Sequence, residues 1–270
     1  MTSKILPPSE DLGTVAYREQ GGGDPLVLIH GVGMQSAAWW PQMDDLARTH
    51  RVIALDMPGH GGSDPLPPGS TLADFVAWLH RVLTSMGLPR ISLAGHSMGA
   101  LIAGGFAVSH PDMVARVALL NGVFRRDPDM RAAVEARARV IDNGHFDTVT
   151  PLRRWFGDGQ ADADAIAQVE GWLRAVDPAG YATAYSAFAS GDATYADGFS
   201  RIPCPLLALT GQDDPNSTPA MSRAMAEAAP KGRAAVIEGH RHMVNLTAAD
   251  VVNRELRDWL ATEDELEGTS

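Results

Sequence analysis

The chain has 270 residues, enough for one large α/β domain or for a domain with an inserted lid. Its formal net charge is −11 and it contains no basic run, which argues against nucleic-acid binding and against anionic membrane surfaces. The single cysteine, Cys204, excludes an intramolecular disulfide and argues against a thiolate metal site.

Residues 1–10 lack the charged-then-apolar pattern of a signal peptide. No apolar stretch approaches the roughly 18 residues that a membrane helix needs. We therefore expect a cytoplasmic protein with no membrane partner. The oligomeric state cannot be read from these patterns, and a homodimer stays open.

Short apolar runs, rich in β-branched residues, recur along the chain and predict strands. The first, Thr14–Arg18, predicts an antiparallel edge strand. Six later runs predict buried strands of a parallel sheet: 26–29, 51–55, 91–94, 117–120, 206–209 and 234–237.

Helical patterns lie between these runs. Apolar residues recur at three- and four-residue steps from Phe75 to Met86, which predicts a helix packed on the sheet, with Thr71 as its N-cap and Gly87 at its end. A similar stripe over 252–260 predicts a last helix. Alternating strands and helices predict an α/β fold, with helices on both faces of a mostly parallel sheet.

Residues 125–199 break the alternation, because they contain helical patches and no strand-like run. Such a segment is far longer than an ordinary connection between two strands. We interpret it as a helical cap, or lid, inserted over the carboxyl ends of the strands, where open α/β sheets bind ligands. Residues 1–124 and 200–270 would then form the core. The helical patches cover 130–141, 164–176 and 178–189.

The sequence Gly95-His96-Ser97-Met98-Gly99 follows a predicted strand and leads into a helical run. This context is typical of a nucleophile elbow, in which a serine sits at a tight strand-to-helix turn and its neighbours two residues away must be small. Ser97 is therefore the candidate nucleophile. The alternative is a Gly/Ser-rich turn before an ordinary helix.

A serine nucleophile needs a base, and the base needs an orienting carboxylate. The loop after the strand 206–209 offers Asp213 and Asp214, and the loop after the last strand offers His240 and His242. One acid and one histidine from these loops, after Ser97, give the chain order Ser, Asp, His of hydrolases built on such a sheet.

An oxyanion hole needs two N–H donors beside the serine. Met98 supplies one by its position directly after Ser97. The turn His30-Gly31-Val32-Gly33 is expected to supply the other, with Val32 ahead of Gly33. Gly31 and Gly33 are expected to lie beside the substrate, and His30 to brace the turn by hydrogen bonding.

On these motifs the chain resembles the α/β-hydrolase superfamily. The resemblance rests on His30–Gly33, Asp56–Asp64, Gly95–Gly99, Gly211–Asp214 and His242–Met243. In that superfamily the acid usually stands three residues after the glycine and the histidine precedes an apolar residue, which implies Asp214 and His242. Ser97 disfavours the members that use an aspartate nucleophile. Because these residues fit a catalytic triad, we expect no metal and no cofactor.

Within the superfamily the chain looks most like capped carboxylesterases and 3-oxoadipate enol-lactonases. This implies a serine hydrolase that cleaves a small carboxylic ester or lactone through an acyl-enzyme. One alternative keeps the triad but changes the reaction, to carbon–carbon bond hydrolysis of a meta-cleavage product, to thioester cleavage or to cofactor-free peroxidase chemistry. The other is a non-catalytic ligand receptor on the same fold.

The expected substrate pocket draws on aromatic and basic residues of the predicted cap. Trp155 and Tyr185, with Trp40 after the oxyanion turn, are expected to line an apolar acyl pocket, although packing of the cap is the alternative. One arginine of the Arg125-Arg126 or Arg153-Arg154 pairs would clamp a substrate carboxylate. We expect this residue to be Arg126, with Arg154 as the second candidate; the alternative is that these arginines lie on a solvated surface.

Overall fold

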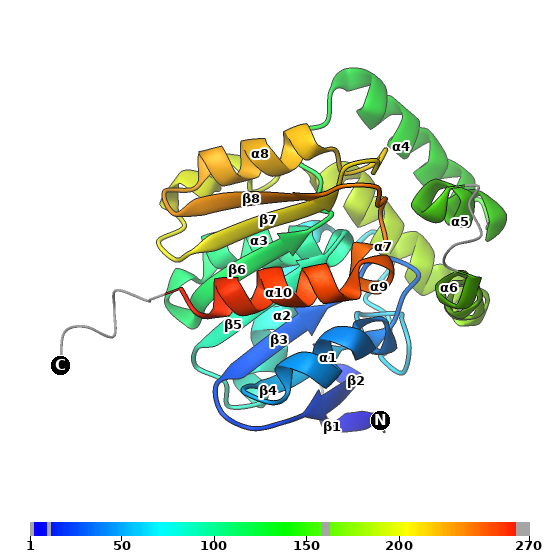
Figure 1. Ribbon diagram of the computed structural model, residues 1–270. Coiled ribbons are helices and arrows are strands. Elements are labelled where there is room, and N and C mark those ends of the chain that lie inside the picture. Colours follow the sequence, from blue (N-terminus) through cyan, green and yellow to red (C-terminus); the bar gives the residue numbers. More distant parts are fainter. Residues whose placement is uncertain (1–2, 10–11, 158–162, 263–270) are drawn as a thin grey trace.

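The computed structural model describes residues 3–9, 12–157 and 163–262. Eight strands form one sheet in the order β1-β2-β4-β3-β5-β6-β7-β8 (Figure 1). The strands are β1 (Lys4–Ser9), β2 (Gly13–Gln20), β3 (Pro25–Ile29), β4 (Arg51–Leu55), β5 (Ile91–His96), β6 (Val114–Leu120), β7 (Leu206–Gly211) and β8 (Gly232–Ile237). From β4 to β8 all neighbours are parallel, which confirms the predicted α/β architecture.

The first strand was not predicted, and its presence corrects the interpretation of the second. β1 pairs antiparallel with β2, with Ile5 opposite Ala16, and β2 pairs antiparallel with β4. The predicted strand over Thr14–Arg18 is therefore confirmed, but it is not the edge. Two prolines in β1 masked its strand character, and an edge is where a sheet tolerates proline.

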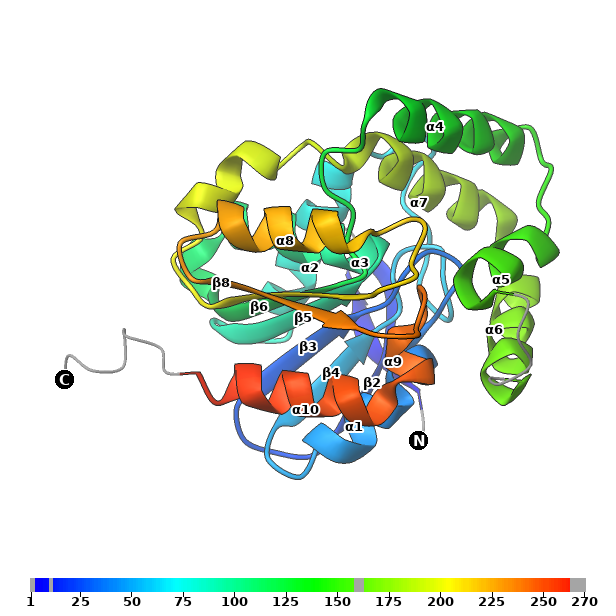
Figure 2. The ribbon, with the colours of Figure 1, turned by 45° about the horizontal axis from the view of Figure 1, so that its top comes forward.

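Helices cover both faces of the sheet (Figure 2). Val27 and Ile29 of β3 share a core with α2 (Leu72–Ser85), α3 (Met98–Ser109) and α8 (Pro219–Ala228). Leu26 and Leu28 point to the other face and pack with α1 (Trp40–Leu46) and α10 (Ala249–Leu260). Successive side chains of a strand point to opposite faces, so the continuous apolar run of β3 serves two cores.

The predicted ends of α2 are confirmed. The Asp74 carboxylate accepts a hydrogen bond from the backbone N–H of Thr71 at 2.7 Å, which completes a capping box. Gly87 follows the helix with φ +65°, in the left-handed region that glycine adopts without strain.

Four helices lie between β6 and β7, towards the carboxyl ends of the parallel strands (Figure 1). They are α4 (Pro128–Asp142), α5 (Val149–Phe156), α6 (Ala163–Ala175) and α7 (Pro178–Gly191). Three match the predicted helical patches, and α5 was not predicted. We refer to 128–191 as the helical insertion; its interpretation as a separate cap over 125–199 stays a prediction. The shorter elements are η1 (Ser36–Trp39), η2 (Pro111–Met113), η3 (Ala196–Arg201) and α9 (Val244–Thr247).

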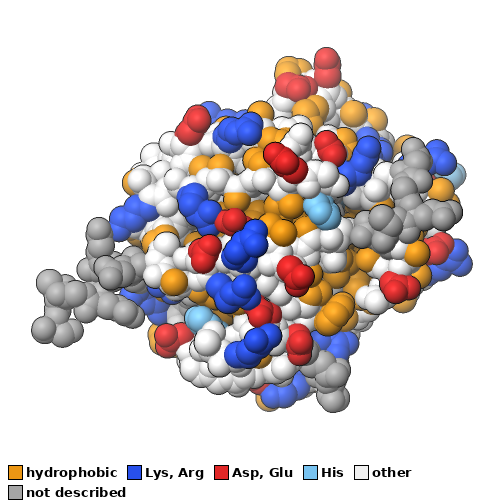
Figure 3. All heavy atoms as spheres, viewed as in Figure 1, with side chains coloured by type: hydrophobic (Ala, Val, Ile, Leu, Met, Phe, Trp, Pro, Cys, Tyr) orange, Lys and Arg blue, Asp and Glu red, His pale blue; other side chains and the backbone are white. Residues whose placement is uncertain are grey.

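The surface is mixed in charge. On the face viewed in Figure 3, acidic and basic side chains are interspersed, without a patch of one sign. Within the described ranges, no helix combines the length and the apolar character required to cross a membrane.

Candidate active site

Ser97 occupies a strained turn between β5 and α3. Its φ is +56° and its ψ −115°, a conformation that L-residues rarely adopt. The turn requires its two glycines, because a Cβ on Gly95 would lie 2.0 Å from the Gly99 carbonyl oxygen and one on Gly99 would lie 2.1 Å from that of Ile29. The local geometry of a nucleophile elbow is therefore present.

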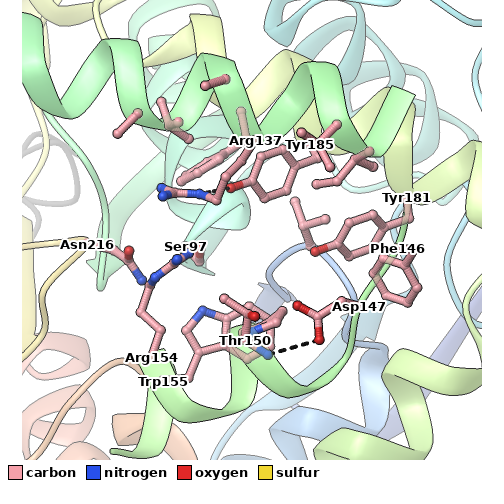
Figure 4. Close-up of a pocket in the computed structure, with 18 of the residues that line it drawn as sticks. Ser97, Arg137, Phe146, Asp147, Thr150, Arg154, Trp155, Tyr181, Tyr185 and Asn216 are labelled. Carbon is pink, nitrogen blue, oxygen red and sulfur yellow. Dashed lines mark hydrogen bonds between the residues drawn. The ribbon is translucent and has the colours of Figure 1, made fainter. Parts of the chain in front are cut away.

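Ser97 and His242 line the same cavity, whose volume is about 900 Å³. The helical insertion supplies most of the remaining walls (Figure 4). No hydrogen bond joins the two side chains among the described residues. In an enzyme without substrate, such a bond is often long and tightens only when substrate binds.

His242 is held by a carboxylate. Its Nδ1 lies 2.7 Å from Asp214 Oδ2, and both side chains are buried. Burial pushes the pKa of Asp214 upward, but the charge and hydrogen bond of His242, with bonds from Asn121 and Asn216, hold it below its usual value. Asp214 is therefore ionised and fixes the ring so that Nε2 is free to act as a base.

Asn121 completes this arrangement and was not predicted. Its Nδ2 donates to Asp214 Oδ2 at 2.8 Å, and its φ is +48°, directly after β6. Asparagine tolerates the left-handed region better than most residues. An asparagine followed by Gly122 at the end of a strand was the available signal.

The two rival residues face elsewhere. His240 Nδ1 lies 2.9 Å from Thr247 Oγ1, at the end of α9. Asp213 is exposed, and its N–H donates to the His240 carbonyl oxygen. Of the four residues in the two loops, the structure brings together only Asp214 and His242.

The turn after β3 leaves the backbone N–H of Val32 available beside Ser97. The Gly33 N–H donates to His60 Nε2 at 2.9 Å, which engages the alternative donor. The N–H groups of Val32 and Met98 have no acceptor among the described residues. Val32 lines the cavity, and a Cβ on Gly31 would lie 2.9 Å from Ser97 Cβ, so this turn lies against the serine.

Buried histidines brace the loops around the site. His30 accepts from the Met57 N–H through Nε2, at 2.9 Å, and its Nδ1 lies 2.7 Å from the Gly31 carbonyl oxygen. Burial lowers the pKa of His30 well below its usual value and that of His60 to about 4. Both rings are therefore neutral near pH 7, and His30 braces the turn as the sequence indicated.

Comparison with known proteins decides the family. The model of the alpha/beta hydrolase family matches residues 26–255. The chain belongs to this family.

One curated relative and two solved structures that are similar to most of the chain are named as hydrolytic enzymes. The chain is 51% identical over 262 residues to the (E)-2-((N-methylformamido)methylene)succinate hydrolase of Acinetobacter baylyi, which covers 97% of this chain and 99% of that protein. An esterase of Thermogutta terrifontis with malate bound is 25% identical, with a TM-score of 0.84 and coverage of 96% and 98%. The enol-lactonase of Burkholderia xenovorans is 26% identical, with a TM-score of 0.80 and coverage of 92% and 97%.

Of the residues predicted to contact the substrate of this hydrolase, some line the cavity and others do not. Trp155 and Tyr185 line the cavity, and the Trp155 indole stacks on the His242 ring at 5.9 Å between centroids. Trp40 is 52% exposed on α1 and does not line the cavity formed by the described residues. Gly33 packs under Leu173 and Tyr181 instead of facing the cavity.

The arginines also differ in whether they line the cavity and whether they are paired with a carboxylate. Arg126 lines the cavity, but its Nη1 lies 3.3 Å from Asp192 Oδ1 and its guanidinium stacks on Phe188. It is therefore engaged in holding the start of α4 to α7, and its role as a substrate clamp stays a prediction. Arg125 pairs with Asp197 at the surface. Arg154 lines the cavity, and so does Arg137, which the sequence did not single out.

Among the described residues no group of three or more His, Cys, Asp or Glu side chains is arranged to hold a metal ion.

Proposed function

We propose that this hydrolase cleaves an acyl bond of a small molecule through a covalent acyl-enzyme on Ser97. The observation that carries the proposal is that Ser97 and His242 line one cavity while His242 is hydrogen-bonded to the buried, ionised Asp214. This is the constellation that a serine nucleophile needs.

In the first half of the reaction, His242 Nε2 removes the proton from Ser97 Oγ, which attacks the carbonyl carbon. The bond between this carbon and the leaving group then breaks, and the His242 imidazolium donates its proton to the departing atom. Asp214 stabilises the imidazolium and keeps Nδ1 protonated. In the second half, water replaces Ser97 as the nucleophile and the acid is released.

The negative charge on the tetrahedral oxygen needs donors that are already oriented. The unengaged N–H groups of Val32 and Met98 meet this need, and Met98 begins α3, whose positive dipole end faces the same point. We assign these two groups as the oxyanion hole.

The acyl bond is an ester, a lactone or an activated amide. The esterase and the enol-lactonase support the first two. The 51% identical relative is named for a substrate with a formamide group, whose carbonyl is also open to attack by serine. Because that relative covers nearly the whole chain, we propose that the natural substrate has a formamide or similarly activated carbonyl.

Carbon–carbon bond hydrolysis and thioester cleavage stay as alternatives on the same residues. The relative's substrate is an unsaturated succinate, not a simple ester, and this keeps the carbon–carbon alternative open. Product analysis separates them: formate from an N-formyl substrate requires carbon–nitrogen cleavage, whereas a shortened carbon skeleton requires carbon–carbon cleavage.

The test is a rapid-mixing assay with p-nitrophenyl acetate and p-nitrophenyl butyrate on the wild type and Ser97→Ala. We expect a burst of one p-nitrophenolate per active site followed by turnover, and neither in the variant. Equal activity of the two proteins would refute the role of Ser97. Ligand binding without any turnover of esters or N-formyl compounds would favour the receptor alternative.

A further inference from the structure

Two arginines from different helices enter the cavity that Ser97 lines. Arg137 comes from α4 and Arg154 from α5, and Figure 4 shows both side chains in this cavity. The Arg137 Nε donates to the Tyr185 hydroxyl at 3.1 Å, which fixes the guanidinium and leaves its terminal nitrogens available. The two cations thus lie in the wall of an otherwise largely apolar and aromatic chamber.

These arginines differ from Arg126, Arg131 and Arg174 of the same region, which pair with carboxylates. Arg126 and Arg131 share Asp192, at 3.3 and 3.1 Å, and Arg174 pairs with Glu170 at 2.6 Å. Within the described residues, neither Arg137 nor Arg154 forms a salt bridge.

Because the two arginines are partly buried and carry like charges, their positive charges are electrostatically unfavourable without an anion between them. Burial lowers the pKa of Arg154, and the positive charge of Arg137 lowers it further. Two like charges held close together in a partly buried cavity repel each other, and an anion between them removes this repulsion.

One acidic group beside the pair offsets the positive charge of Arg154 only in part. Asp147 also lines the cavity, but its Oδ1 accepts the N–H groups of Val149 and Thr150, at 2.8 and 3.2 Å. It therefore caps the start of α5, and two arginines stand against one carboxylate that is already engaged.

We infer that Arg137 and Arg154 form a subsite for a substrate carboxylate, so that the hydrolase selects acyl compounds carrying a negatively charged group away from the reacting carbonyl. The inference rests on the proposed acyl hydrolysis. Two guanidinium groups match a carboxylate with paired N–H donors, and the 51% identical relative is named for a succinate substrate.

Binding of succinate, butyrate and inorganic phosphate by calorimetry tests the subsite without any turnover. Succinate and butyrate have the same carbon chain and differ in one carboxylate. We expect succinate to bind the wild type at least tenfold more tightly than butyrate, and about 10- to 100-fold more weakly to Arg137→Met or Arg154→Met. Tighter binding of phosphate than of succinate would overturn the carboxylate assignment.

The matched controls are Arg139→Met and Arg153→Met. They remove the same charge from the same two helices, but Arg139 and Arg153 are exposed and do not line the cavity. Succinate should bind both as it binds the wild type. Equal losses in all four variants would show a general charge effect and refute the subsite. Thermal unfolding of each variant identifies any that fails to fold, and Arg137→Lys and Arg154→Lys then replace it, with partial loss expected.

The kinetic readout is the ratio of kcat/KM for monoethyl succinate to that for ethyl butyrate. The ratio should fall about 10- to 100-fold in Arg137→Met and Arg154→Met and hold in the controls. An unchanged ratio with turnover that depends on Ser97 would refute the subsite alone. Succinate binding that depends on the two arginines, together with hydrolysis that does not depend on Ser97, would refute the proposed function alone.

Discussion

His96 Nε2 lies 2.8 Å from the backbone carbonyl oxygen of His242, and the centroids of the two imidazole rings are 5.0 Å apart. Burial lowers the pKa of His96 to about 3, so the ring is neutral and its Nε2–H donates to this carbonyl. The residue before the proposed nucleophile, Ser97, thus holds the loop that carries the proposed base, His242. A hydrogen bond across the sheet connects two parts of the site that are far apart in the sequence.

Removing this bond should slow the reaction without touching a reacting group. We expect His96→Ala to lower kcat by up to about 100-fold, because a small displacement of a catalytic group is costly. Steady-state kinetics with p-nitrophenyl butyrate measures it. The control is His240→Ala, whose ring contacts Thr247 and which should keep the wild-type kcat. Equal kcat values for His96→Ala and the wild type would show that the loop is positioned by other contacts.

Asp214→Asn should be the most damaging change that keeps the shape of the site. An amide at this position favours the wrong tautomer of His242, and kcat should fall about 10⁴-fold. Asp213→Asn is the adjacent control and should keep its activity, since Asp213 is exposed. The same kcat in both variants would mean that Asp214 does not orient the base.

Two glycines with opposite surroundings, the crowded Gly99 and the open Gly171, should respond in opposite ways to substitution by alanine. In Gly99→Ala the new Cβ would meet the Ile29 carbonyl oxygen at 2.1 Å, so unfolding free energy should fall by at least the ~1–3 kcal/mol typical of overpacking. In Gly171→Ala, within α6, the Cβ meets open space and stability should rise by about 0.5–1 kcal/mol. Urea unfolding measures both; a stable Gly99→Ala would mean that the elbow relaxes.

Stability should fall with acid through the buried histidines. In the unfolded chain His60 binds a proton below its ordinary pKa of about 6.5, whereas in the folded protein it stays neutral down to about 4. The unfolded state thus binds more protons in this window, and each such histidine costs about 1.4 kcal/mol per pH unit as the pH falls. Above pH 6.5 its full contribution is present.

Urea unfolding between pH 7 and 4.5 measures this slope. His60→Gln should show a slope shallower by about 1.4 kcal/mol per pH unit at the acid end of the range, whatever its stability at neutral pH. Identical slopes for His60→Gln and the wild type would contradict the neutral, buried state of His60.

The neighbouring arginines Arg125 and Arg126 should differ sharply in their contribution to stability. Arg126→Met leaves the buried Asp192 without its buried partner, although Arg131 remains, and should cost about 3–5 kcal/mol. Arg125→Met breaks a surface pair with Asp197 and should cost no more than about 1 kcal/mol. Equal unfolding midpoints for the two variants would contradict the structural role of Arg126.

The sequence was sufficient for the elements whose signals are local. Apolar runs placed the parallel strands, and the Gly-flanked Ser97 placed the elbow, because both depend on neighbouring residues alone. The prolines of β1 concealed an edge strand, and α5 is too short to show a clear helical period. Local pattern carries little information about such elements.

The walls of the cavity depend on contacts across the fold, which the sequence does not display. Arg126 and Arg154 look alike as members of basic pairs, yet only Arg126 meets a buried carboxylate, since Asp192 follows α7. Arg137 lies in a polar helix, where no motif distinguishes it from the other arginines. Its position matters because α5 brings Arg154 to the same cavity. Asn121 follows β6 and Asp214 lies in the loop after β7. The two residues meet because these strands are neighbours in the sheet.

β6 and β7 are neighbours in the sheet, with Val117 opposite Leu206, although the whole helical insertion separates them in the chain. Because the entropy of closing a connection grows slowly with its length, at about 0.6 kcal/mol per doubling, this crossover tolerates large replacements. Evolution can therefore exchange the insertion as a module. Such an exchange would change which molecules enter the cavity, while Ser97, Asp214 and His242 would be inherited without alteration.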